Sequence, residues 1–283
     1  MHRRTLLHNL VCGLAGAVLS NDIGNADAAS GTGKSSRVGL QLYTVRKSLQ
    51  LDFEATLRRV AELGIKEVEF AGYFDQPPAR INKLLKRLGI RAPSAHISTE
   101  TLRNGLPSAI ESAKIIGHKY LVLGYLPEEE RKSLQDYGRL VDLLNRAGEE
   151  CSRAGLRLAY HNHDFEFAAI GGTVPYDLIL AGTDPRTVQM EMDLYWVTKA
   201  GLNPVSLFEK HPGRFPLVHV KDMDNTPRKF FTEVGRGVID FRTVFSKAKE
   251  AGIKHYFIEQ DETPGDPLES VGISLNYLRA LKF

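Results

Sequence analysis

The chain has 283 residues, of which 42% are hydrophobic and 25% charged, and its formal net charge at pH 7 is +3. Because this charge is small and forms no evident basic stripe, the sequence argues against a nucleic-acid-binding protein. The two cysteines, Cys12 and Cys151, are too few for a thiolate zinc site. Only Cys151 lies in the part expected to fold, so no internal disulfide is expected.

Residues 1–37 have the pattern of an export signal followed by a flexible linker. Arg3 and Arg4 precede an apolar run at 10–19 that is too short to span a bilayer, and residues 26–28 (ADA) offer a small-x-small cleavage site. The paired arginines resemble a twin-arginine signal, which exports folded proteins. We therefore expect a periplasmic or exported protein without stable membrane insertion after signal cleavage.

The remaining residues, 38–283, are predicted to form a single domain. Between the predicted strands, apolar residues spaced by three and four indicate helices, and glycines such as Gly64 and Gly89 follow them. Eight strand–helix units over this length predict an α/β fold, a single (β/α)8 TIM barrel. An open doubly wound sheet is the alternative, but no glycine-rich phosphate loop follows the first strand. The predicted strands are 38–43, 67–70, 92–97, 120–123, 157–161, 188–193, 217–220 and 256–259.

Polar side chains end all but one of these predicted strands. In a TIM barrel the catalytic groups lie at the carboxyl ends of the strands, and side chains two positions apart share a face. The sequence therefore predicts a polar ring around the barrel axis at one mouth. Its predicted members are Gln41, Tyr43, Glu69, His96, Ser98, His161, His163, Asp193, His219, Lys221, Glu259 and Asp261.

The stretch 157–167, RLAYHNHDFEF, is the densest in candidate ligands. His161 and His163 point to the same side of an extended chain, whereas Glu166 has the opposite parity and joins them only if the backbone bends. A polar strand-to-loop transition is the alternative interpretation.

Carboxylates and imidazoles confined in one cavity need a compensating charge. A divalent metal would supply it, and two imidazoles with two carboxylates favour manganese, cobalt, zinc or ferrous iron over magnesium or calcium. The alternative is buried ion pairing without metal, which remains open for Glu69 and Lys221.

Five motifs resemble the sugar phosphate isomerase/epimerase group of the xylose isomerase-like TIM barrels. They are GLQLYTVR at 39–46, YHNHDFEF at 160–167, MDLYW at 192–196, HVKD at 219–222 and IE at 258–259. Members of this group include isomerases, epimerases, inosose dehydratases, keto-glycoside-cleaving enzymes and apurinic endonucleases. The resemblance therefore implies a metal-dependent sugar site and leaves the substrate open.

The resemblance also implies a ligand set. It makes Asp193, His219 and Glu259 metal ligands, and it expects a glutamate on the fifth strand, where this chain has His161-Asn162-His163. The fourth ligand is therefore left open between His163, the first choice, and Glu166.

A metal that chelates two neighbouring oxygens of a keto-sugar would polarise the carbonyl while a base removes the adjacent proton. Glu259 and Glu166 are the candidates for this proton transfer, with His161 as a substitute. Lys221 either holds a substrate oxygen or pairs with Asp222. Sugar contacts are expected from Gln41, Glu69 and His96, and pocket walls from Tyr43 and Trp196, although Trp196 fits a core position equally well.

We therefore predict a metal-dependent sugar isomerase or epimerase. The alternatives are a keto-glycoside hydrolase, lyase or dehydratase using the same site, and an exported sugar-binding protein without catalysis. An abasic-site nuclease is disfavoured by the weak charge and the signal. The partner is a small sugar, and a homo-oligomer is possible. His118, His211 and His255 are expected to face solvent.

Overall fold

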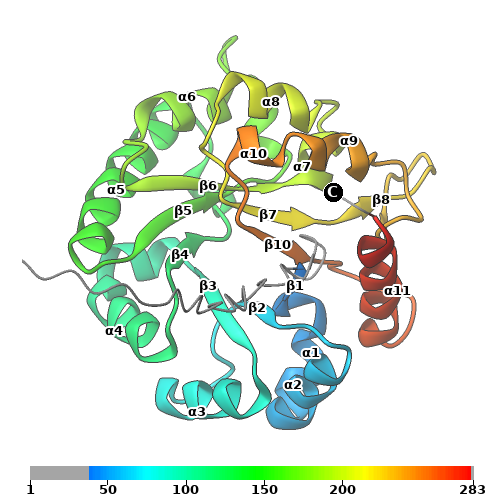
Figure 1. Ribbon diagram of the computed structural model, residues 1–283. Helices are drawn as coiled ribbons and strands as arrows, with labels where there is room; N and C mark the ends of the chain where they lie inside the picture. Colours follow the sequence, from blue (N-terminus) through cyan, green and yellow to red (C-terminus); the bar gives the residue numbers. More distant parts are fainter. Residues whose placement is uncertain (1–37, 282–283) are drawn as a thin grey trace, which may run out of the picture. The chain divides into compact units, whose positions relative to one another are not determined.

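The computed structural model describes residues 38–281, which form the predicted barrel. Eight parallel strands close in the order β1-β10-β7-β6-β5-β4-β3-β2, and the helices surround them (Figure 1). The barrel strands are β1 (Val38–Gln41), β2 (Glu67–Phe70), β3 (Arg91–Ile97), β4 (Tyr120–Leu123), β5 (Arg157–His161), β6 (Val188–Asp193), β7 (Leu217–Val220) and β10 (His255–Ile258). The predicted signal in residues 1–37 lies outside the described residues.

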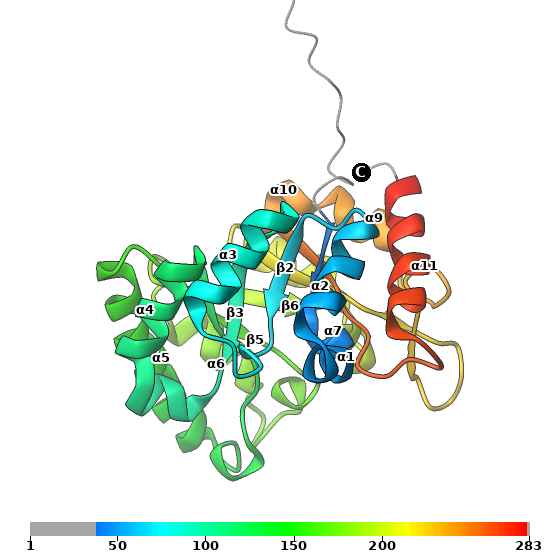
Figure 2. The ribbon, with the colours of Figure 1, turned by 90° about the horizontal axis from the view of Figure 1, so that it is seen from below.

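The helices flank the strands along their length (Figure 2). None of the helices in residues 38–281 combines the length and the apolar character needed to cross a membrane. They are α1 (Arg46–Leu51), α2 (Phe53–Glu62), α3 (Pro78–Leu88), α4 (Leu106–Ile116), α5 (Leu134–Arg153), α6 (Pro175–Gly182), α7 (Leu194–Lys199), α8 (Pro204–Lys210), α9 (Phe241–Ser246), α10 (Ala248–Ala251) and α11 (Pro267–Ala280).

The first strand is shorter than the sequence pattern indicated. It ends at Gln41 because the Gln41 side chain accepts a hydrogen bond from the Tyr43 backbone N–H, at 3.1 Å, and so caps a short 3₁₀ helix, η2 (Leu42–Val45). Tyr43 consequently leaves the strand and is 42% exposed. Gln41 stays buried inside the barrel.

One end of the barrel interior is filled by apolar side chains. They form a cluster separate from the main core, which lies between sheet and helices; its members are Tyr120, Val122, Ala159, Leu217 and Phe257. Gly39 is required beside this cluster, because a Cβ there would lie 2.8 Å from both the Glu67 carbonyl oxygen and Phe257. The polar residues therefore occupy the other end, where the strands terminate.

His118 does not face solvent, as the sequence pattern had suggested. It is buried, its Nδ1 lies 2.6 Å from the Ala92 carbonyl oxygen, and its ring stacks on Tyr73. The expectation failed because His118 follows Gly117, where α4 ends, and its ring packs against Phe70 and Tyr73. Burial lowers the pKa of His118 to about 4.

This burial predicts acid sensitivity. In the unfolded chain His118 has a pKa of about 6.5, so the stability it contributes is fully present above that pH and is lost as pH falls towards 4, by up to about 3 kcal/mol. Urea unfolding at pH 7.5 and 4.5 measures this, and the loss is expected to shrink in His118→Asn. An equal loss in both proteins would contradict the prediction.

Candidate active site

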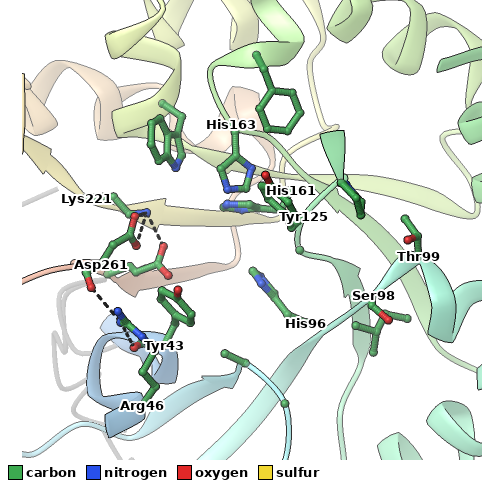
Figure 3. A pocket seen from close by; sticks show the side chains of 18 of the residues that line it. Tyr43, Arg46, His96, Ser98, Thr99, Tyr125, His161, His163, Lys221 and Asp261 are labelled. Atoms are coloured by element: carbon green, nitrogen blue, oxygen red, sulfur yellow. Dashed lines mark hydrogen bonds and ion pairs between the residues drawn. The ribbon is translucent and has the colours of Figure 1, made fainter. Parts of the chain in front are cut away.

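A cavity of about 830 Å³ opens where the barrel strands end, and Figure 3 shows its side chains. Of the residues predicted for the site, it is lined by Tyr43, His96, Ser98, His161, His163, Trp196, Lys221, Glu259 and Asp261. The sequence reasoning did not single out Arg46, Tyr125 and Arg131, which also line the cavity. Both arginines lie against aromatic rings: the Arg131 guanidinium is 3.4 Å from the Phe165 ring centre, and that of Arg46 is 3.9 Å from the Tyr43 ring centre.

Asp193, His219 and Glu259 form what we call the carboxylate group. One ligand atom from each lies within 4.8 Å of the others, and all three residues are buried. His219 Nδ1 lies 2.9 Å from Glu259 Oε2 and 3.9 Å from Asp193 Oδ2. Asp193 Oδ1 accepts hydrogen bonds from the first backbone N–H groups of α7, at Tyr195 and Trp196. The start of this helix therefore fixes the carboxylate and leaves Oδ2 turned towards His219.

Lys221 supplies the positive charge beside this group. Its Nζ lies 2.8 Å from Glu259 Oε2, 3.1 Å from Asp193 Oδ2 and 3.0 Å from Asp261 Oδ1, and Figure 3 shows the ammonium beside Asp261. Although burial opposes the charge, Asp193, Asp261 and Glu259 hold the pKa of Lys221 well above its usual range. Lys221 is therefore an ammonium at neutral pH.

Asp222 is not the partner of Lys221, which was the other possibility raised by the sequence. Its carboxylate accepts hydrogen bonds from the backbone N–H groups of Gly235 and Gly237, at 2.9 and 3.0 Å. A Cβ at Gly237 would lie 2.3 Å from Asp222 Oδ1. The glycines of this loop therefore allow it to wrap around Asp222, and Lys221, on the opposite face, is left for the site.

A second set of potential ligands, which we call the histidine group, comprises His96, His161, Glu191 and His219. Glu191 Oε2 lies 2.6 Å from His96 Nε2, and 3.2 Å from both His161 Nδ1 and His219 Nε2. The sequence reasoning missed Glu191. It precedes Asp193 by two positions and so shares its face, which is the signal that identified pairs on other strands but was not applied to this one.

Gln41 and Glu69 lie beneath these groups and do not line the cavity. Gln41 Nε2 donates to Glu69 Oε1 at 2.7 Å, and the same oxygen lies 2.7 Å from His219 Nε2. Their contacts orient imidazoles, which is a positioning role. Gly124, at the one apolar strand end, makes room for His96, because a Cβ there would lie 2.3 Å from His96 Nδ1.

Neither alternative for the fourth ligand belongs to the two groups, although the His163 ring centre lies 5.1 Å from that of His161. His163 stacks on Phe165, with ring centres 5.4 Å apart, and lies 5.4 Å from Trp196 in the cavity wall. Glu166 accepts hydrogen bonds from the Tyr160 hydroxyl at 2.6 Å and the His163 backbone N–H at 2.8 Å. Among the described residues, His161 is the fifth-strand side chain nearest to the carboxylate group, with Nε2 3.9 Å from Asp193 Oδ2.

Glu166 provides a test of this placement. Burial raises the pKa of Glu166 to about 7, so the stability gained by burying the neutral acid is present below about pH 4.5 and is lost as pH rises through 7, by up to about 3 kcal/mol. We expect Glu166→Gln to abolish this loss in urea unfolding between pH 5 and 8. We also expect turnover to stay within a few-fold of wild type, and a loss comparable to that of a catalytic residue would contradict the placement.

Two imidazoles at the cavity have opposite protonation. Although burial opposes it, Glu69 and Glu191 raise the pKa of His96 to about 10. Burial and the neighbouring His219 lower the pKa of His161 well below its usual range. At neutral pH the cavity therefore presents one imidazole that can donate a proton and one that can accept it.

The carboxylate group fits a divalent metal. Asp193 Oδ2 is buried and accepts no aligned hydrogen bond among the described residues, although the Lys221 ammonium lies 3.1 Å away. His219 can direct Nδ1 to an ion and donate Nε2–H to Glu69. A carboxylate that orients a metal-bound imidazole in this way is the usual second layer of such sites. Three protein ligands with an open position are typical of catalytic zinc centres.

Comparisons with known proteins agree with the fold. Residues 57–281 match the family described as xylose isomerase-like TIM barrel. The chain is 27% identical over 260 residues to an inosose dehydratase from Bacillus licheniformis, covering 78% of this chain and 86% of that protein. An inosose dehydratase from Geobacillus kaustophilus is 26% identical over 275 residues, with coverage of 81% and 87%.

Solved structures give the same result. A sugar phosphate isomerase/epimerase from Parabacteroides distasonis superposes with a TM-score of 0.76 at 28% identity, covering 90% of this chain and 97% of that one. The IolI protein, solved with a bound zinc atom, has a TM-score of 0.70 at 16% identity, with coverage of 87% and 99%. The latter likeness shows the fold alone.

Proposed function

Since the chain belongs to the xylose isomerase-like TIM barrel family of sugar-processing enzymes, we propose that it removes the proton next to the carbonyl of a keto-sugar or keto-cyclitol and eliminates water. The observation that carries the proposal is the carboxylate group with Lys221 beside a cavity large enough for a sugar. The similarity to inosose dehydratases favours elimination as the outcome. This revises the first expectation of an isomerase or epimerase to the dehydratase alternative.

Asp193, His219 and Glu259 would hold the metal, for which manganese, cobalt, zinc and iron are the candidates. When bound, the ion would polarise the substrate carbonyl and stabilise the negative charge that develops on its oxygen. Lys221 Nζ, fixed between Glu259 and Asp261, donates to a substrate oxygen. Its charge favours the same developing anion.

The proton transfers are assigned to the two cavity imidazoles. His161 is unprotonated and its Nδ1 has no hydrogen-bond partner among the described residues, so it accepts the proton next to the carbonyl. His96 carries a proton, which it donates to the departing hydroxyl so that water leaves. Of the earlier candidates for the base, Glu166 is occupied by Tyr160, and Glu259 is kept as a ligand.

The reaction is tested on metal-reconstituted protein with inosose and a panel of keto-sugars in D₂O. Elimination is expected to produce the ultraviolet absorption of an unsaturated ketone, with loss of His161→Gln activity. Deuterium incorporation without elimination would replace the dehydratase by an isomerase or epimerase, the candidate that the Parabacteroides relative favours. Calorimetric sugar binding without either signal would leave a binding protein.

We also propose that the enzyme is exported, on the twin-arginine-like pattern of residues 1–37. In a bacterial host, the full chain should then be recovered in the periplasm, shortened at its N-terminus. Lys substitution of Arg3 and Arg4 should retain it in the cytoplasm. Cytoplasmic recovery of the unmodified chain would contradict the proposal.

A further inference from the structure

The histidine group has an arrangement that hydrogen bonding alone does not explain. His161 Nδ1 and Glu191 Oε1 are buried and have no hydrogen-bond partner among the described residues. His161 Nδ1 lies 3.2 Å from Glu191 Oε2 without the alignment of a hydrogen bond. If His161 Nδ1 is protonated, its N–H is buried without an acceptor. If it is unprotonated, its lone pair faces the Glu191 carboxylate. A cation beside both atoms resolves the conflict.

The spacing of the group matches a four-coordinate ion. Zinc ligands lie about 2.0–2.1 Å from the metal, so their donor atoms are about 3.3 Å apart in a tetrahedron. Two of the distances to Glu191 Oε2, to His161 Nδ1 and His219 Nε2, are 3.2 Å. His96 Nε2 is closer, at 2.6 Å, and must withdraw slightly. The ring of His96 points into the cavity (Figure 3), so it has room to do so.

The charge around the group favours the binding of cations. The connected network contains five carboxylates, Glu69, Glu191, Asp193, Glu259 and Asp261, and one permanent ammonium, Lys221. Because the carboxylates outnumber the ammonium, a cation beside them offsets part of their repulsion.

We propose that the histidine group is a second divalent-metal site, which takes zinc through the imidazoles of His96, His161 and His219 and the carboxylate of Glu191. Its three nitrogen donors suit zinc better than the oxygen-rich carboxylate group does. His219 offers Nδ1 to one ion and Nε2 to the other. Holding both ions would require both ring nitrogens of His219 to release their protons to solvent, and Glu69 Oε1, now 2.7 Å from Nε2, would lose that donor.

This site has a consequence for catalysis, which rests on the proposed function. Zinc at the histidine group would occupy the nitrogens of His96 and His161 that move protons. Activity of the protein loaded with manganese, which suits the oxygen-rich carboxylate group, is therefore expected to fall when zinc is added.

Metal stoichiometry tests the site without any assay of activity. Chelator-stripped protein is dialysed against zinc and its metal content measured. Wild type is expected to bind two zinc ions, Glu191→Gln one, Glu259→Gln one, and the double variant none. Glu149→Gln, an exposed substitution on α5, should retain two. Circular dichroism verifies that each variant is folded.

The outcomes separate this proposal from the proposed function. If Glu191→Gln binds as much zinc as wild type while Glu259→Gln binds none, the histidine site is refuted and the carboxylate site stands. If Glu191→Gln loses zinc while Glu259→Gln does not, the histidine site stands and the proposed catalytic site fails. Cobalt titration of wild type needs no variant: visible absorption of four-coordinate cobalt should saturate at two equivalents, and saturation at one overturns the second site.

Discussion

Replacing Glu259 by glutamine is expected to reduce kcat on the keto substrate by at least about 10³-fold, which corresponds to about 4 kcal/mol of transition-state stabilisation. Glu259 Oε2 lies 2.9 Å from His219 Nδ1 and 2.8 Å from Lys221 Nζ. The substitution removes the charge that holds both the metal and the ammonium in place, while the amide keeps the shape of the side chain.

The effect is measured by steady-state kinetics at saturating metal, together with bound metal per chain. The fold should be retained, because Lys221 keeps Asp193 and Asp261 as partners. Glu149→Gln is the matched control, since its side chain is 67% exposed and should leave kcat unchanged. Activity within ten-fold of wild type in Glu259→Gln would show that the chemistry takes place elsewhere.

Replacing Lys221 by methionine is expected to destabilise the metal-free protein by about 3–5 kcal/mol. The side chain is 2% exposed and contacts three carboxylates. Methionine fills the space but leaves the largely buried carboxylates of Asp193, Glu259 and Asp261 repelling one another. A divalent ion at the carboxylate group should restore part of the loss, because it binds the folded state alone.

Urea unfolding of Lys221→Met with a chelator and with added manganese measures both parts. Lys210→Met is the control, because its ammonium is 57% exposed in an ion pair with Asp177 and contributes about 1 kcal/mol or less. Adding Asp261→Asn to Lys221→Met should recover some stability by removing one of the repelling charges. Equal stabilities of Lys221→Met and Lys210→Met would refute the electrostatic account.

The barrel and its polar mouth follow from local rules that a single sequence displays. Alternation along each strand separates the residues that face the helices, such as Leu40, from those that face the axis, such as His219. The rule worked because side chains along a barrel strand alternate between the barrel axis and the surrounding helices. The same rule also places Glu191 on the axis side, but this residue was overlooked because only the last residue of β6 was considered.

Contacts between distant strands were less accessible to sequence reasoning. Nothing near Gln41 in the sequence shows that it bonds Glu69, and nothing near Gly124 shows that it makes room for His96. Glu166 is a converse case, because it was kept as the second choice for a ligand although its parity is opposite to that of His163. Its carboxylate is instead taken up by the Tyr160 hydroxyl and the His163 backbone, which only the bend of the chain after β5 brings together.

The apolar cluster that includes Phe257, packed against Gly39, fills one end of the barrel interior. Ions and substrate would then both reach the site through the cavity, whose walls include Tyr125 and Trp196. A substrate bound in the cavity would block access to the metal site. Chelators should therefore strip the enzyme more slowly when a non-reacting sugar analogue is bound, so that the resting enzyme is most exposed to metal loss between turnovers.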